Sequence, residues 1–203
     1  MKKTAVLVFE GFCNYEISVL LEMLVLNEKP VTFVANRLSM IRCEEGMQVI
    51  PDCTLDDMIL EDYDSLVISG SFAEGLYNNF KDEKLMEVIE QFEKQGKLIA
   101  AISSAPMILC KANIMRDRKF QAGVDKSWFL EDINMLLHEE QMKYLIDVPE
   151  MKKMRENGNS VDDFMMENKV LTAYGWKYRE WAAAFIEYFG LNPYRTSFGL
   201  DAK

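Results

Sequence analysis

Short apolar runs alternate along this chain with segments in which apolar residues recur every three or four positions. The runs are bounded by turn residues, and their near-continuous hydrophobicity is typical of strands buried on both faces of a parallel sheet. The strands predicted in this way are Thr4–Phe9, Val31–Ala35, Ser65–Ile68 and Leu98–Ile102. The helical spacing predicts helices over about 14–27, 82–95, 104–112 and 176–189.

Turn residues separate these elements and define two further strand pairs. Pro30 prevents continuation of the first helix, and Gly96 suits the position just after the helix over 82–95. Glu44-Glu45-Gly46 predicts a hairpin turn between 39–43 and 47–51. A second pair, 161–166 and 169–172, is expected to turn at Glu167-Asn168.

The alternation of strands and helices predicts a doubly wound α/β fold, a mostly parallel sheet with helices on both faces and right-handed crossovers. Residues 124–160 break the rhythm, because they are rich in Asp, Glu, Lys and Met with weak periodicity. We interpret them as a helical insertion within a single domain spanning 1–203.

Charge and cysteine usage narrow the function classes. The 23 basic and 33 acidic residues give a net charge of 23 − 33 = −10, which disfavours nucleic acid and membrane surfaces as partners. The apolar run after the basic Met1–Lys3 is too short for a signal peptide or a membrane span, so we expect a cytoplasmic protein. Four cysteines without a CxxC pair and a single histidine predict free thiols and neither a metal nor another cofactor.

Candidate chemistry gathers where the predicted strands end. In an open parallel sheet, ligands bind at the carboxyl ends of the strands, and three such ends carry small or polar residues, namely 10–16, 69–71 and 103–106. Ser103 follows the apolar run directly and precedes a helix. Its side chain is therefore expected to stand at the strand tip, beside amides that stabilise negative charge.

The string LIAAISSAP, residues 98–106, resembles the nucleophile elbow of the ThiJ/PfpI superfamily, which includes the Parkinsonism-associated deglycase, intracellular peptidases and class I glutamine amidotransferase relatives. Glu16 matches the superfamily glutamate that hydrogen-bonds the nucleophile, and Ser69-Gly70-Ser71 matches its oxyanion turn. Pro51–Asp57 matches a Pro-Asp segment before an acidic turn. The resemblance covers residues 4–123 well and implies a flavodoxin-like, class I glutamine amidotransferase-like fold and a homodimer.

The sequence departs from the superfamily at the elbow itself. Ser103 stands where the resemblance implies a cysteine, and a serine hydroxyl is hardly ionised near neutral pH, so it needs a base. Neither Ser104 nor the loop at 124–127, where relatives carry histidine, supplies one. His138 lies in the insertion, as a surface residue or as a base that folds back, and Glu16 is the other candidate base. Ser103 either acts as nucleophile or only shapes a pocket.

Two functions remain open for a small-molecule pocket at the strand tips. The first is a hydrolase, amidase or deglycase-type enzyme with Ser103 as nucleophile, Glu16 as proton partner, and the Gly70 and Ser104 amides as oxyanion donors. Ser71 then lines the pocket, and Cys13 lies at its rim as a displaced thiol or an ordinary loop cysteine. The alternative is a non-catalytic module that binds a metabolite or a partner.

Overall fold

The computed structural model describes residues 1–124, 126, 145, 150, 152–153, 156 and 162–201, which build one seven-stranded sheet and a separate two-stranded hairpin. The sheet has the order β5-β2-β1-β6-β7-β9-β8 and is parallel except for β8, which pairs antiparallel with β9. Its strands are β1 (Lys3–Leu7), β2 (Val31–Ala35), β5 (Cys53–Thr54), β6 (Tyr63–Ile68), β7 (Leu98–Ile102), β8 (Met165–Glu167) and β9 (Val170–Ala173). The hairpin pairs β3 (Ile41–Arg42) with β4 (Gln48–Val49).

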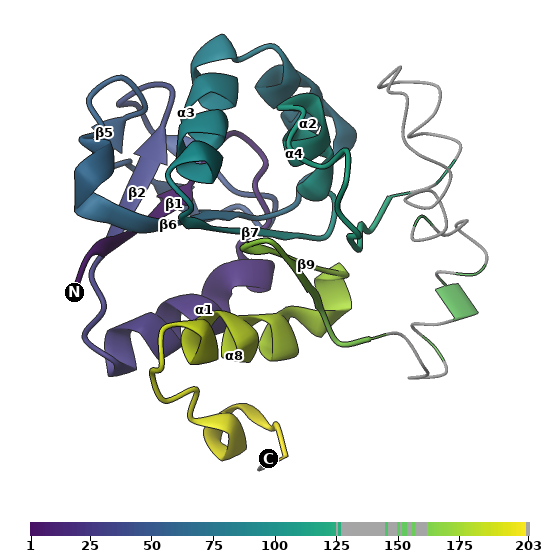
Figure 1. The fold of residues 1–203 in the computed structure, drawn as a ribbon. Coiled ribbons are helices and arrows are strands. Elements are labelled where there is room, and N and C mark those ends of the chain that lie inside the picture. The colour runs from purple at the N-terminus through teal and green to yellow at the C-terminus, as the bar shows by residue number, and fades with distance from the viewer. Residues whose placement is uncertain are drawn as a thin grey trace.

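Helices cover both faces of the sheet, as Figure 1 shows. The described α-helices are α1 (Tyr15–Leu26), α2 (Ala73–Phe80), α3 (Glu83–Lys94), α4 (Pro106–Lys111) and α8 (Tyr178–Tyr188). The described residues also form three short 3-10 helices, η1 (Leu60–Asp62), η2 (Gly175–Lys177) and η3 (Arg195–Phe198). Because α1 and α8 pack below the sheet and α2, α3 and α4 above it, the predicted doubly wound α/β fold is confirmed.

Local sequence signals account for these elements. Asp82 caps α3 by accepting a hydrogen bond from the Leu85 amide at 3.0 Å, and Gly96 after the helix adopts φ 62° as expected. The apolar face of α3 is buried against the sheet. Strand β7 is buried along its whole length, as its unbroken apolar run predicts.

The structure differs from the sequence prediction in a few places. Helix α2 was not predicted, because its eight residues include one glycine and two asparagines, which are weak helix formers. The hairpin strands are shorter than expected, two residues each. The insertion predicted over 124–160 lies mostly outside the described residues and stays a prediction. None of the described helices is long and apolar enough to cross a membrane.

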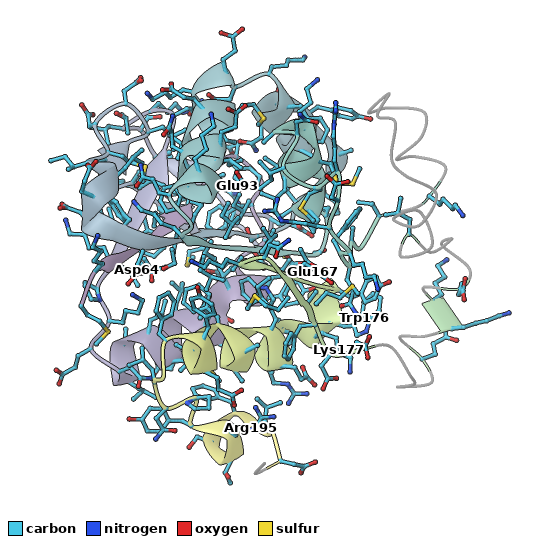
Figure 2. All side chains as sticks on the ribbon, in the orientation of Figure 1. Asp64, Glu93, Glu167, Trp176, Lys177 and Arg195 are labelled. Carbon is cyan, nitrogen blue, oxygen red and sulfur yellow. The ribbon has the colours of Figure 1, made fainter. Side chains whose placement is uncertain are left out.

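A buried ion pair lies at the amino-terminal ends of the parallel strands, at the opposite end from Ser103. The Lys29 ammonium is fully buried and donates to both carboxylate oxygens of Asp64, at 2.7 and 2.8 Å, and to the Lys2 carbonyl at 2.9 Å. It also lies 4.3 Å from the centre of the Phe189 ring in the loop after α8. Figure 2 shows Asp64 at this edge, between the sheet and the lower helices.

We predict that Asp64→Ala lowers the free energy of unfolding by about 3 kcal/mol, because it leaves the Lys29 charge buried without its partner. Lys29→Met removes the charge itself and fills the same space, so it is expected to cost less. Urea denaturation of the two variants and the wild type measures both effects. The account of this edge is wrong if Asp64→Ala is the milder substitution.

Candidate functional site

Ser103 occupies the turn between β7 and α4, and its backbone conformation is strained. Its φ is 60°, in the left-handed region that residues with a side chain rarely adopt. Two backbone hydrogen bonds hold it there: the Ser103 amide donates to the Ala173 carbonyl at 2.9 Å, and the Gly123 amide donates to the Ser103 carbonyl at 2.6 Å. The half-buried side chain therefore stands at the tip of β7, as the sequence predicts.

Glu16 is the second residue of α1, and its side chain lies beside Ser103 at the strand tips. Its side chain is only 3% exposed. Carboxylate oxygen Oε2 accepts a hydrogen bond from the Gly70 amide at 2.7 Å. The Ser103 hydroxyl lies near the carboxylate, since a Cβ at Gly175 would lie 2.7 Å from Glu16 Oε1 and 3.1 Å from Ser103 Oγ. The structure thus brings together the two residues singled out as nucleophile and proton partner.

Burial raises the pKa of Glu16 from its ordinary value of 4.5 to about 7. The nearby Ser103 hydroxyl and the hydrogen bond from the Gly70 amide oppose this rise because both favour the carboxylate. The charges of Glu44 and Glu45 add to it by repulsion. Glu16 is therefore poised to take up and release a proton near neutral pH, which is the property required of a general base.

Three glycines form the wall around this pair. A Cβ at Gly70 would lie 2.9 Å from Ser103 Cβ and from Glu16 Oε2, and one at Gly175 would lie 2.7 Å from Glu16 Oε1 and 3.1 Å from Ser103 Oγ. A Cβ at Gly123 would lie 3.2 Å from Ser103 Oγ. The absence of side chains at these three positions is what lets the Ser103 hydroxyl and the Glu16 carboxyl approach each other.

The hydroxyl of Ser104 links the elbow to the turn after β6. The Ser71 amide donates to Ser104 Oγ at 3.0 Å, and Ser104 Oγ donates to the Ser71 carbonyl at 3.0 Å. This arrangement changes the expected oxyanion site. The Gly70 amide, proposed from the sequence as an oxyanion donor, is occupied by Glu16 in this structure, whereas no described residue accepts from the Ser104 amide.

Cys13, expected at the pocket rim, is instead buried at 3% exposure. Its amide donates to the Gly70 carbonyl at 2.8 Å, which draws the residue under the turn, and its thiol lies 3.7 Å from Glu45 Oε1. Burial and the neighbouring carboxylates of Glu16, Glu44 and Glu45 raise the pKa of the thiol far above its ordinary range. A buried thiol with a raised pKa is mostly protonated near neutral pH, which favours the ordinary loop cysteine over the displaced thiol.

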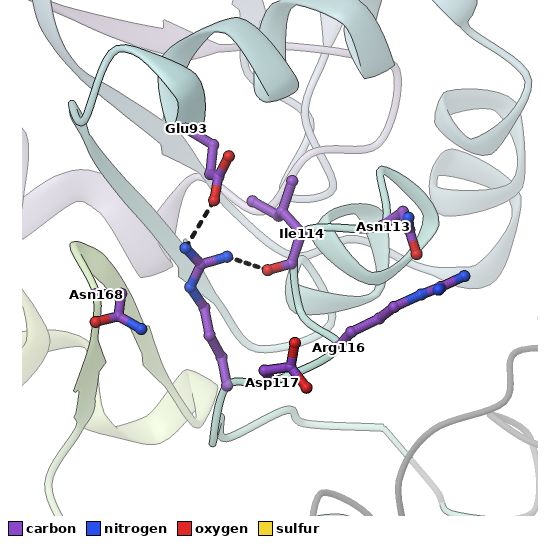
Figure 3. Close-up of a pocket in the computed structure, with 7 residues that line it drawn as sticks. Glu93, Asn113, Ile114, Arg116, Asp117 and Asn168 are labelled. Carbon is purple, nitrogen blue, oxygen red and sulfur yellow. Dashed lines mark hydrogen bonds and ion pairs between the residues drawn. The ribbon is translucent and has the colours of Figure 1, made fainter.

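Two cavities elsewhere on the protein are lined by neither Ser103 nor Glu16. One, of about 230 Å³, lies at the same edge of the sheet, beside the turn after β6; it is lined by Glu10, Gly11, Arg42, Cys43, Phe72, Glu74, Gly75 and Asn78. The other, of about 340 Å³, lies at the opposite edge, near the start of β9 (Figure 3). There Arg118 donates to Glu93 at 2.8 Å and to the Ile114 carbonyl. This second cavity is distant from the strand tips and cannot serve Ser103.

Sequence reasoning missed several residues at the strand tips. Gly123, in the loop after α4, and Gly175, at the start of η2, lie against Ser103 in segments that carry no motif, so only their spatial position reveals them. Tyr174 and Trp176, at the carboxyl end of β9, stack with ring centres 4.8 Å apart. Burial raises the pKa of Tyr174 to about 12, which keeps its hydroxyl neutral.

The described residues contain neither a histidine nor a cluster of metal-binding side chains. Those residues contain no group of three or more His, Cys, Asp or Glu side chains able to hold a metal ion. His138, the alternative base, lies outside the described residues. Glu16 is a titratable group beside Ser103.

Comparison with known proteins agrees with the resemblance seen in the sequence. An uncharacterised protein of Archaeoglobus fulgidus is 34% identical over 82 residues, 40% of this chain and 47% of that protein. Drosophila melanogaster DJ-1alpha is 28% identical over 94 residues, 46% of this chain and 43% of its own. The matched regions span less than half of these curated relatives.

Solved structures show the same fold along nearly the whole chain. A cysteine-to-alanine mutant of a DJ-1 superfamily protein from Salmonella typhimurium superposes with a TM-score of 0.74 at 19% identity, covering 97% of this chain and 96% of that one. Drosophila melanogaster DJ-1beta gives 0.68 at 18% identity, with 91% and 89% covered. The model of the DJ-1/PfpI family matches residues 2–187. The chain therefore belongs to the DJ-1/PfpI family.

Proposed function

We propose that the strand-tip site is a small-molecule hydrolase site in which Ser103 takes the place of the family's elbow cysteine and Glu16 is its general base. The observation that carries this proposal is the position of the Ser103 hydroxyl beside a buried carboxyl whose pKa is about 7, where it favours the ionised form. A serine nucleophile needs a base within hydrogen-bond reach, and that base works best when its pKa lies near the operating pH.

The geometry supports a two-step acyl transfer. As Ser103 Oγ bonds to a carbonyl carbon, its proton passes to the ionised Glu16 carboxylate, and the Ser104 amide is available to the developing oxyanion. Glu16 then gives the proton to the leaving alcohol or amine as that bond breaks. In the second step, water attacks the acyl-serine while Glu16 takes its proton, and Glu16 then returns a proton to Ser103 Oγ as the acid is released.

A non-catalytic binding module is the second candidate. The observation that favours it is the hydrogen bond from the Gly70 amide to Glu16, because an oxyanion site then has one donor fewer. In that case the Ser103 hydroxyl and the amides of the turn would bind a polar group of a ligand without reacting. The homodimer and the cytoplasmic location expected from the sequence also stay predictions.

Hydrolysis of a small activated ester separates the two candidates. With p-nitrophenyl acetate, we predict turnover by the wild type that rises with pH through about 7, as Glu16 becomes ionised. Ser103→Ala should abolish this turnover, and Glu16→Gln should lower kcat roughly 100-fold because the base is lost. Equal rates for the wild type and Ser103→Ala would reject Ser103 as the nucleophile and favour the binding module.

The raised pKa of Glu16 also predicts how stability depends on pH. Between pH 4.5 and about 7 the folded protein holds a proton on Glu16 that the unfolded chain releases, so the free energy of unfolding falls as the pH rises. Glu16→Gln removes this dependence. Relative to the wild type, the variant should gain on the order of 3 kcal/mol across that interval. Denaturation curves that stay parallel for both proteins at every pH would show that Glu16 titrates normally.

A further inference from the structure

The first turn of α1 lacks a cap of its own. Asn14 occupies the cap position in a helical conformation, with φ −71° and ψ −37°, and makes no side-chain capping hydrogen bond. The first amides of a helix have no intrahelical acceptor and need one from elsewhere. This matters for the site because Glu16 lies in that same turn.

Glu45, in the turn of the β3–β4 hairpin, supplies the missing acceptors. Its Oε2 accepts from the Asn14 amide at 3.0 Å, and its Oε1 accepts from the Tyr15 amide at 2.7 Å. Although burial opposes ionisation, these hydrogen bonds hold the pKa of Glu45 below its ordinary value. Glu45 therefore places a carboxylate at the positive end of α1, some thirty residues away along the chain.

Backbone hydrogen bonds hold the hairpin and the start of α1 in register. The Gly11 amide donates to the Arg42 carbonyl at 2.8 Å, and the Glu44 amide donates to the Phe12 carbonyl at 2.9 Å. Gly11, Phe12 and Cys13 belong to the loop between β1 and α1. This loop also binds the turn after β6, because the Cys13 amide donates to the Gly70 carbonyl. The loop before Glu16 is thus clamped between the hairpin and the turn that hydrogen-bonds Glu16.

We propose that Glu45 is a positioning residue, which caps α1 from the hairpin and thereby holds the Glu16 carboxyl against Ser103. The inference rests on the proposed function, in which Glu16 is the proton partner of Ser103. It extends the site to a third chain segment that does not touch Ser103 and that no motif marks.

Glu44 provides a matched control. It is the next residue in the turn, its charge also raises the pKa of Glu16, and it makes neither hydrogen bond to the Asn14 and Tyr15 amides. The charge of Glu44 contributes more to the raised pKa of Glu16 than the charge of Glu45 does. If charge alone mattered, Glu44→Ala would therefore move the titration of Glu16 at least as far as Glu45→Ala.

The test is an NMR comparison of the full chain and its Glu45→Ala and Glu44→Ala variants. We expect Glu45→Ala to speed hydrogen exchange of the Asn14 and Tyr15 amides about fivefold, the effect of losing a helix cap, with exchange of Val67 in β6 unchanged. We also expect it to shift the Glu16 titration to lower pH by more than Glu44→Ala does. Glu44→Ala should leave exchange of both α1 amides unchanged.

Unchanged exchange of the two amides in Glu45→Ala, or a Glu16 titration that moves no further than in Glu44→Ala, would overturn the proposal. If Glu45→Ala does not fold, Glu45→Gln and Glu44→Gln carry the same comparison, because glutamine keeps one acceptor where the carboxylate offers two. Neither measurement involves turnover. Failure of this inference is therefore distinguishable from failure of Ser103 to hydrolyse an ester.

Discussion

The site depends on the strained backbone of Ser103. A φ of 60° costs a serine of the order of 1 kcal/mol, and such a conformation persists only where its surroundings hold it. Here the hydrogen bonds to Ala173 and Gly123 fix the residue on both sides, and β7 is paired with β6 and β9 along its length. The rigid sheet therefore determines where the Ser103 hydroxyl points.

The same turn explains why a carboxyl can be buried at the strand tips. Glu16 is buried here because the Gly70 amide donates to its carboxylate and the nearby Ser103 hydroxyl favours its ionised form, which together limit the cost of burying its charge. Burial still prevails, so the proton is held until about neutral pH. The result is a carboxyl with a pKa of about 7 beside a hydroxyl, surrounded by glycines whose lack of a side chain allows the close approach.

Local sequence signals were sufficient to place Ser103. Apolar runs that end in small residues locate the strand tips, and parallel strands bring those tips to one edge, so the pattern places Ser103 near the 10–16 segment. The choice of Glu16 within that segment came from the family resemblance. The rest depends on contacts between distant segments. The sequence suggested that the Gly70 amide faces a ligand, but a carboxyl from 54 residues away takes it.

Cys13 and Glu45 illustrate the same limit. Cys13 lies in a loop that would ordinarily be exposed, and it is buried only because the hairpin and the turn after β6 close over it. Glu45 belongs to an ordinary acidic turn in the sequence, and its contact with α1 becomes visible only once the chain is folded. Neither contact leaves a periodic or motif signal.

Covalent trapping tests the central claim, that Ser103 is a nucleophile activated by Glu16. The folded protein would be incubated with a fluorophosphonate, which phosphonylates activated serines and releases fluoride, and its peptides would be examined by mass spectrometry. The account predicts one adduct, on Ser103, that forms faster as the pH rises through about 7 and only slowly in Glu16→Gln. An unmodified Ser103 under conditions that fully label a known serine hydrolase would contradict it.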